Sequence, residues 1–245
     1  MERFSVAGST GRVPRMTDGT PYIDGHPFAI RALPSGLRTV PRNSAITHED
    51  EDEARLRTIV SGWAFRFKRF KDGRRHILEI LLPGDTFGIE SLFGQSSNSL
   101  TWAATAVTYS ITDSAATLAL FDAEPWFRRR LMQSVLEGKA AMEEWLAHLG
   151  QCDAEERTAA LFVVLHERLL QRGLATASSF ILELTQQELA DTVGIHLIHL
   201  NRILARLRNR HLISTSGQEV TLSDPAGLSD LIPISTYTAR PIRPI

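Results

Sequence analysis

Residues 184–213 constrain the fold of this chain more than any other stretch, because they contain the signals for two short helices separated by a glycine. Thr185 and Glu188 have the spacing of a capping box, which predicts the N-terminus of the first helix. Gly194 is expected to end that helix, since glycine adopts a left-handed C-terminal conformation without strain. A second helix is predicted by apolar residues at helical spacing, namely Leu197, Leu200, Ile203, Leu204 and Leu207. Two short helices joined by a glycine turn predict a helix-turn-helix.

The other face of the second predicted helix is polar and basic. Between Thr185 and Gly217, four arginines against two acidic residues give a local charge of +2, whereas the formal net charge of the whole chain is −1. A basic helix after a glycine turn is typical of a recognition helix in the major groove of double-stranded DNA, and a helical hairpin with a solvated basic face is the alternative. The predicted DNA-binding residues are His196, His199, Asn201, Arg202, Arg206 and Arg208.

A short β-hairpin is predicted directly after this second helix. The polar turn Ser214–Glu219, centred on Gly217, separates Leu212 and Ile213 from the apolar pattern of residues 220–222. Such a hairpin is a wing, which can contact the DNA backbone beside the groove. We therefore predict a winged helix-turn-helix domain over residues 152–232, followed by a C-terminal tail over residues 233–245 that contains three prolines.

An all-β pattern precedes these helices, and it predicts a jelly-roll-like β-roll over residues 31–121. Residues 64–70 alternate between apolar and charged side chains, and Asp72-Gly73 is a hairpin signal before the return strand at residues 76–82. Further short strands are expected at residues 59–62, 102–108, 109–112 and 116–120. Many short strands divided by turns are typical of a barrel or roll. Residues 1–30 lack periodicity and are expected to form a flexible arm.

A long helix is predicted between these parts, over residues 122–151. Asp122 is expected to cap it, and Pro125 suits its first turn. Six residues follow one another at the 4-3-4-3-4 spacing that is typical of a coiled-coil seam, and they are the predicted dimerisation residues: Leu131, Val135, Gly138, Met142, Trp145 and Leu149. A second apolar row contains Met132, Leu136, Ala140 and Leu146. We expect one row to pack on the roll and the other on a partner helix in a homodimer; two rows of ordinary core are the alternative.

Composition excludes several classes of protein. The single cysteine, Cys152, cannot form an internal disulfide and disfavours an iron–sulfur cluster, which normally takes four cysteine ligands. The sequence contains neither an apolar run long enough to span a membrane nor a signal-peptide pattern, so we expect a cytoplasmic protein without membrane contact. It also lacks a catalytic triad, paired metal ligands and a phosphate-binding loop, and an enzyme is therefore not expected.

The predicted order of a β-roll, a long helix, a second helix and a winged helix-turn-helix resembles the CRP/FNR superfamily of bacterial regulators, an α+β architecture with an N-terminal sensor domain. The resemblance covers about residues 37 to 231 and is carried by Ser61-Gly62, Asp72-Gly73, residues 83–88, residues 154–161 and residues 184–213. It implies a homodimeric transcription factor that binds an inverted-repeat operator, with RNA polymerase as a further candidate partner. The alternative is a roll that senses a small molecule and acts through protein partners.

One loop departs from the family members that bind cyclic AMP. Those members resemble one another in a phosphate cassette that begins with Gly-Glu and later contains Arg-Ser. Here Ile89 follows Gly88, while Ser99 and Leu100 occupy the Arg-Ser positions. The arginine matters because it neutralises the cyclic phosphate, and the loop from residue 94 to 101 contains no cation. We predict that cyclic AMP is not bound in the usual way, and the effector stays open.

The resemblance also bears on single residues of the recognition helix. Arg202 occupies the position of the family's recurrent base- or phosphate-binding arginine, whereas Ile198 stands where the family often has glutamate. The spacing of His196 and His199 is also compatible with a metal, although DNA contact is the stronger interpretation. Haem stays open as a cofactor, because His76 and His148 are lone histidines that could bind its iron. The simpler interpretations are an exposed strand position for His76 and a favourable charge at a helix C-terminus for His148.

Overall fold

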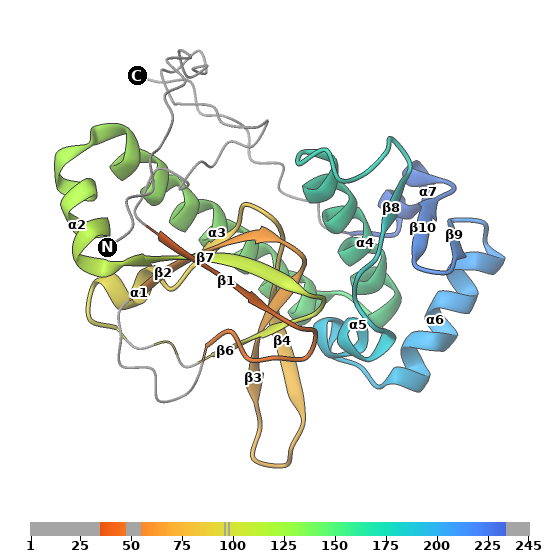
Figure 1. Ribbon diagram of the computed structural model, residues 1–245. Coiled ribbons are helices and arrows are strands. Elements are labelled where there is room, and N and C mark those ends of the chain that lie inside the picture. The colour runs from red at the N-terminus through yellow and green to blue at the C-terminus, as the bar shows by residue number, and fades with distance from the viewer. Residues whose placement is uncertain (1–34, 48–54, 96, 98, 234–245) are drawn as a thin grey trace.

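The computed structural model describes residues 35–47, 55–95, 97 and 99–233. The expected N-terminal arm and residues 234–245 of the expected tail lie outside these ranges. Figure 1 shows a β-rich part and a second, mostly helical part, with the long helix α3 (Pro125–Gln151) running from one to the other. This arrangement confirms the predicted α+β architecture.

The β-rich part is a roll of two antiparallel sheets. The four-stranded sheet has the order β1 (Ser35–Val40), β7 (Val107–Asp113), β2 (Arg55–Ser61) and β5 (Thr86–Phe87). The three-stranded sheet has the order β4 (Arg75–Leu81), β3 (Ala64–Arg69) and β6 (Leu100–Ala103). The two sheets share a core made of Ile46, Ile59, Ala64, Leu81, Phe87, Ala103, Val107 and Tyr109.

Tight turns join the strands where the sequence predicts them. Strands β3 and β4 form the hairpin expected around Asp72-Gly73, and Gly73 has a φ of +85°. Gly62, between β2 and β3, has a φ of +81°, and a Cβ atom there would lie 2.1 Å from the carbonyl oxygen of Ala106. Only glycine fits this position, because any side chain would collide with backbone.

Two strand predictions near the end of the roll are wrong. Residues 102–108 do not form one strand, because β6 ends at Ala103 and β7 begins at Val107. The expected strand at residues 116–120 is part of helix α2 (Ser114–Ala123). The reason is local: the Asp113 side chain accepts hydrogen bonds from the amides of Ala115 (3.0 Å) and Ala116 (3.2 Å), and the following segment is rich in alanine and leucine, which favour helix.

The long helix begins slightly later than predicted. Asp122 lies within α2 and does not cap α3; the N-cap is Glu124, and Pro125 occupies the first turn as expected. Close to this end, Phe127 and Leu131 are buried against the roll, in a cluster with Leu56 and Leu92, the latter from the short helix α1 (Ile89–Leu92). The first turns of α3 are therefore fixed to the roll.

The helical part follows Cys152. Helix α4 (Ala154–Leu170) begins with a capping box, formed by Asp153 and Glu156. The helix-turn-helix consists of α5 (Gln186–Val193) and α6 (Leu197–Asn209). A small antiparallel sheet has the order β8 (Ser179–Ile181), β10 (Glu219–Leu222) and β9 (Ile213–Ser216), and helix α7 (Pro225–Asp230) follows it. These elements confirm the winged helix-turn-helix fold.

Candidate nucleic-acid interface

Local hydrogen bonds fix the first helix of the motif. The Thr185 hydroxyl accepts a hydrogen bond from the Glu188 amide (3.2 Å), and the Glu188 carboxylate accepts one from the Thr185 amide (2.7 Å). Gly194 ends α5 in the left-handed conformation, with a φ of +77°. Both features are those that the sequence predicts, and they set the sharp turn that directs α6 away from α5.

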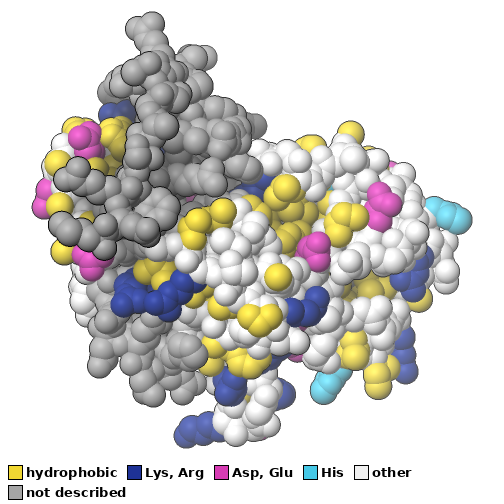
Figure 2. Space-filling model, in the orientation of Figure 1, with side chains coloured by type: hydrophobic (Ala, Val, Ile, Leu, Met, Phe, Trp, Pro, Cys, Tyr) yellow, Lys and Arg dark blue, Asp and Glu magenta, His cyan; other side chains and the backbone are white. Residues whose placement is uncertain are grey.

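Helix α6 has one buried and one exposed face. Leu200, Ile203, Leu204 and Leu207 are buried in the domain core. All six predicted DNA-binding residues are exposed. Figure 2 shows His and Lys or Arg side chains gathered along the edge of the molecule that α6 occupies in Figure 1. Helix α6 thus presents a polar, cationic surface made of the residues that the sequence predicts to bind DNA.

The arginines of this face differ in their surroundings. Arg206 and Arg210 both bind the carboxylate of Glu155, at 3.1 Å and 2.9 Å. Glu155 lies in the first turn of α4, and its side chain is only 14% exposed. Within the described part of the chain, Arg202 and Arg208 form no ion pair. Sequence reasoning missed the Glu155 contact, because no local spacing relates positions 155 and 206.

The wing lies beside the recognition helix. Strands β9 and β10 are antiparallel: Ile213 lies opposite Leu222 at one end, and Ser216 lies opposite Glu219 at the other. Gly217 in the turn has a φ of +60°. The residues at the tip are exposed, while Val220 is buried. The predicted hairpin is confirmed, and its tip is polar and exposed.

The first helix of the motif rests on the roll. Arg75 on β4 forms an ion pair with Asp191 on α5, and Arg42 lies 3.4 Å from the Glu188 carboxylate. His76 is adjacent, with its ring 3.6 Å from the position that a Cβ atom would take at Gly194. Burial lowers the pKa of His76, although the nearby Asp191 acts in the opposite direction. The helix-turn-helix is therefore docked on the roll through charged side chains.

A second charged contact ties α4 to the roll. The Asp85 carboxylate binds Arg168 at 2.7 Å and Arg172 at 2.6 Å. Arg168 also donates to the carbonyl oxygen of Ile80, at 2.9 Å, and Arg172 donates to that of Pro83, at 3.1 Å. The turn at residues 83–85 belongs to one of the motifs that resemble the CRP/FNR superfamily. It is part of the contact between the two parts of the molecule.

The cassette region of the roll contains an arginine that the sequence did not reveal. Arg66 on β3 donates to the Ser99 hydroxyl at 3.1 Å and binds the carboxylates of Glu79 at 3.3 Å and Glu90 at 3.4 Å. The cassette loop itself has no cation, as noted, but a strand supplies one. Burial raises the pKa of Glu79, and Arg66 opposes that shift. The guanidinium of Arg66 is therefore already bound by two carboxylates of the roll.

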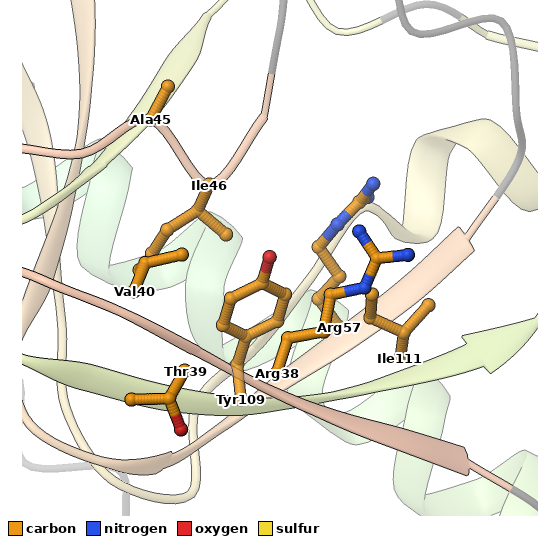
Figure 3. A pocket seen from close by; sticks show the side chains of 8 residues that line it. All are labelled: Arg38, Thr39, Val40, Ala45, Ile46, Arg57, Tyr109 and Ile111. Atoms are coloured by element: carbon orange, nitrogen blue, oxygen red, sulfur yellow. The ribbon is translucent and has the colours of Figure 1, made fainter.

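The roll also contains a cavity of about 300 Å³. Figure 3 shows the guanidinium groups of Arg38 from β1 and Arg57 from β2 near each other, beside Tyr109 and Ile111 of β7. Strand register places Arg38 opposite Tyr109 and Arg57 opposite Ile111, so all four side chains share one sheet face. The cations of this cavity come from strands and not from the cassette loop.

The two apolar rows predicted on α3 are not divided as expected. Within the predicted seam, Leu131 is only 3% exposed and Trp145 and Leu149 are half-buried, whereas Met142 is 60% exposed. The first row is divided between the roll and solvent, because the roll covers only the start of α3; the expected contact with a partner helix stays a prediction. The exposed apolar stripe combines residues of both rows: Met132, Val135, Leu136, Met142 and Leu146.

His148, left open as a haem ligand, and the single cysteine, Cys152, are both buried. His148 is buried, with its Nδ1 2.8 Å from the carbonyl oxygen of Glu144, and its ring stacks on Trp145. Burial raises the pKa of the Cys152 thiol, which disfavours the reactive thiolate. Among the residues that the structure describes, no cluster of three or more His, Cys, Asp or Glu side chains could hold a metal ion. None of the helices in these ranges is long and apolar enough to cross a bilayer.

A β-roll, a long helix and a winged helix-turn-helix with a cationic outer face define a class of DNA-binding regulator. Two family models match this division: the cyclic nucleotide-binding domain over residues 37–123 and the Crp-like helix-turn-helix domain over residues 156–231. The chain belongs to the CRP/FNR family of transcriptional regulators.

Individual relatives support this assignment. The chain is 31% identical over 208 residues to a CRP-like cAMP-activated global transcriptional regulator of Mycobacterium tuberculosis, covering 83% of this chain and 92% of that protein. It is 31% identical over 176 residues to the nitrogen fixation regulation protein FixK of Rhizobium meliloti, covering 70% of this chain and 76% of that protein. The solved structure of FixK2 from Bradyrhizobium japonicum matches with a TM-score of 0.74 and 25% identity, covering 83% of this chain and all of that one.

Proposed function

We propose that this protein binds an inverted-repeat operator as a homodimer and regulates transcription without cyclic AMP as the usual effector. The observation that carries the proposal is the outer face of α6, where exposed Arg202 and Arg208 have no ion-pair partner among the described residues. Unpaired cations on a helix beside a wing match the phosphates and base edges of a major groove.

Each side chain of this face has a proposed role. Arg202 is the candidate for a bidentate contact to guanine O6 and N7, and Asn201 for a contact to adenine. His199 donates to a base or a phosphate. His196 at the helix N-terminus and Arg208 further along contact phosphates, which positions the helix without reading sequence. Arg206 is held by Glu155 and contributes less.

The exposed apolar stripe on α3 supports the homodimer. Five large apolar side chains in solvent along one helix are unfavourable for a monomer, and a second copy of α3 would bury them. Of the predicted seam, Val135, Gly138 and Met142 are exposed and available, whereas Leu131 packs on the roll. A two-fold dimer would present two α6 helices about 34–36 Å apart, one turn of DNA.

The cassette supports the proposed independence from cyclic AMP. A bound phosphate would have to displace Glu79 and Glu90 from Arg66, or bind beside them without its own cation.

In this proposal, residues 31–121 form the sensor domain, 122–151 the dimerisation helix and 152–232 the DNA-binding domain. The protein has no enzymatic role, acts in the bacterial cytoplasm where the DNA lies, and contacts RNA polymerase if it activates transcription.

The cavity in the roll favours one alternative. A space of about 300 Å³ beside Arg38 and Arg57 suits a small ligand, so the roll could sense a molecule and signal to a protein partner. Sequence-selective DNA binding separates the two functions, because a sensor that acts only on protein partners should bind all DNA sequences equally weakly.

Fluorescence anisotropy with a pool of inverted-repeat DNA tests the proposal. We expect sequence-selective binding that weakens steeply with salt and does not change when cyclic AMP is added. Sequencing the bound DNA would then give the operator. Binding that is unselective with and without cyclic AMP would contradict the proposed function, and selective binding only with cyclic AMP would contradict the cassette argument alone.

A further inference from the structure

An apolar side chain stands on the otherwise polar outer face of α6. Ile198 is 69% exposed, the largest exposed fraction among the large hydrophobic residues that the structure describes. The other apolar residues of α6 with a large side chain are buried or half-buried. Ile198 is therefore separate from the domain core, and it is also far along the chain from the apolar stripe of α3.

The position of Ile198 on the helix places it among the proposed base-reading residues. It is the second residue of α6, directly after Leu197 and two residues after the N-cap His196. Side chains three and four positions apart share a helix face, so Ile198 lies beside Asn201 and Arg202. The first turns of a recognition helix are the part that reaches base edges.

The chemistry of the major groove gives this side chain one suitable partner. Among the four bases, thymine alone presents a methyl group there, at C5, whereas most of the other exposed groups are hydrogen-bond donors and acceptors. Isoleucine cannot form hydrogen bonds, so placing it against a polar base edge would desolvate that edge without compensation. Contact with a methyl group instead removes apolar surface of both partners from water.

We propose that Ile198 is a specificity-determining residue that recognises the methyl group of one thymine in each operator half-site. The inference rests on the proposed function, because it concerns the same helix in the same groove. A protein-docking role for Ile198 is less favoured, since its neighbours at positions 199, 201 and 202 are polar and no adjacent exposed apolar residue on α6 extends the patch.

Replacing thymine by deoxyuridine tests the proposal directly, since this change removes the methyl group alone. In the operator selected from the DNA pool, each thymine of a half-site is replaced in turn and binding is measured by anisotropy. We expect one position at which uracil weakens binding roughly fourfold, the effect of one buried methyl group, and by more than tenfold when both half-sites are changed.

Variants of the protein complete the test. Ile198→Ala is expected to remove the sensitivity to uracil at that position, and Ile198→Val to retain most of it. The matched control is Ile181→Ala, because Ile181 is an isoleucine that is 47% exposed and lies on the edge strand β8 rather than on α6. This control should bind thymine and uracil operators as the unaltered protein does.

Several outcomes would overturn the inference. Selective binding in which every thymine tolerates uracil overturns it and leaves the proposed function intact. A uracil effect that persists unchanged in Ile198→Ala also overturns it. If Ile198→Ala changes the sedimentation of the protein and leaves the uracil effect in place, Ile198 is a subunit contact. Unselective binding by the unaltered protein overturns the proposed function and this inference together.

Discussion

Arg66 in the sensor roll and Arg202 in the recognition helix have opposite surroundings. Arg66 is enclosed by the carboxylates of Glu79 and Glu90, while Arg202 is exposed with no carboxylate bound among the described residues. Arg66 is thus paired within the roll, whereas the charge of Arg202 has no ion-pair partner among the described residues, as the proposed contact with DNA requires.

Removing Arg202 would break the DNA-binding side of this comparison. We expect Arg202→Ala to weaken binding to the selected operator by roughly 100-fold or more, because a bidentate arginine–guanine pair is lost in both half-sites. Anisotropy with operator and with scrambled DNA measures the effect. Arg74→Ala is the control, since Arg74 is an exposed arginine of the β3–β4 hairpin, distant from α6 in sequence. Unchanged selectivity in Arg202→Ala would contradict the assigned recognition helix.

Removing Arg66 tests the roll side. Arg66→Ala leaves two carboxylates without their shared partner, and the free energy of unfolding should fall by about 1–2 kcal/mol because the site is partly buried. Urea denaturation followed by circular dichroism measures this change. Arg74→Ala, which breaks an exposed pair with Asp72, should leave the free energy of unfolding nearly unchanged, because solvent screens that pair. An equal loss in both variants would mean that the Arg66 cluster is no more than a surface ion pair.

The contact between the two regions is expected to depend on pH through His76. Because burial lowers the pKa of His76 in the folded protein, protonation disfavours the docked state. Stability is therefore present above the ordinary histidine pKa of about 6.5 and is lost as the pH falls from there towards the lowered value. Hydrogen exchange of the α5 amides at several pH values measures this. The variant His76→Asn should flatten the dependence; an equally steep profile in that variant would assign it to another group.

The smallest effect is expected at Glu155. This carboxylate binds two arginines at the C-terminal end of α6, as Glu79 and Glu90 bind Arg66 in the roll. Glu155→Gln releases Arg206 and Arg210 for phosphate contact, so DNA affinity should rise about two- to threefold and its salt dependence should become steeper. Asp72→Asn removes the same charge on the β3–β4 hairpin and serves as the control. A similar gain in both variants would show a general effect of net charge rather than release of these two arginines.

Much of the DNA-binding domain could be predicted because its signals are local. The capping boxes of α5 and α4 and the helix stop at Gly194 each involve residues within a few positions of one another. The same locality explains the failure at α2: residues 116–120 form a short apolar run, and the cap that decides for helix is Asp113, which lies outside that run. A short apolar run does not distinguish strand from helix without its flanking residues.

The sequence by itself determined the family, the order of the elements and the polar face of α6, since periodicity, turn glycines and caps act between near neighbours. Only the tertiary structure decided which charges meet. Arg66 on β3 reaches Ser99, just before β6, and Glu90 on helix α1, and Glu155 reaches Arg206 from another helix. It also decided which apolar residues of α3 stay exposed, because the roll covers Leu131 and leaves Met142 free. These contacts join residues tens of positions apart, and their distances depend on how the whole chain packs.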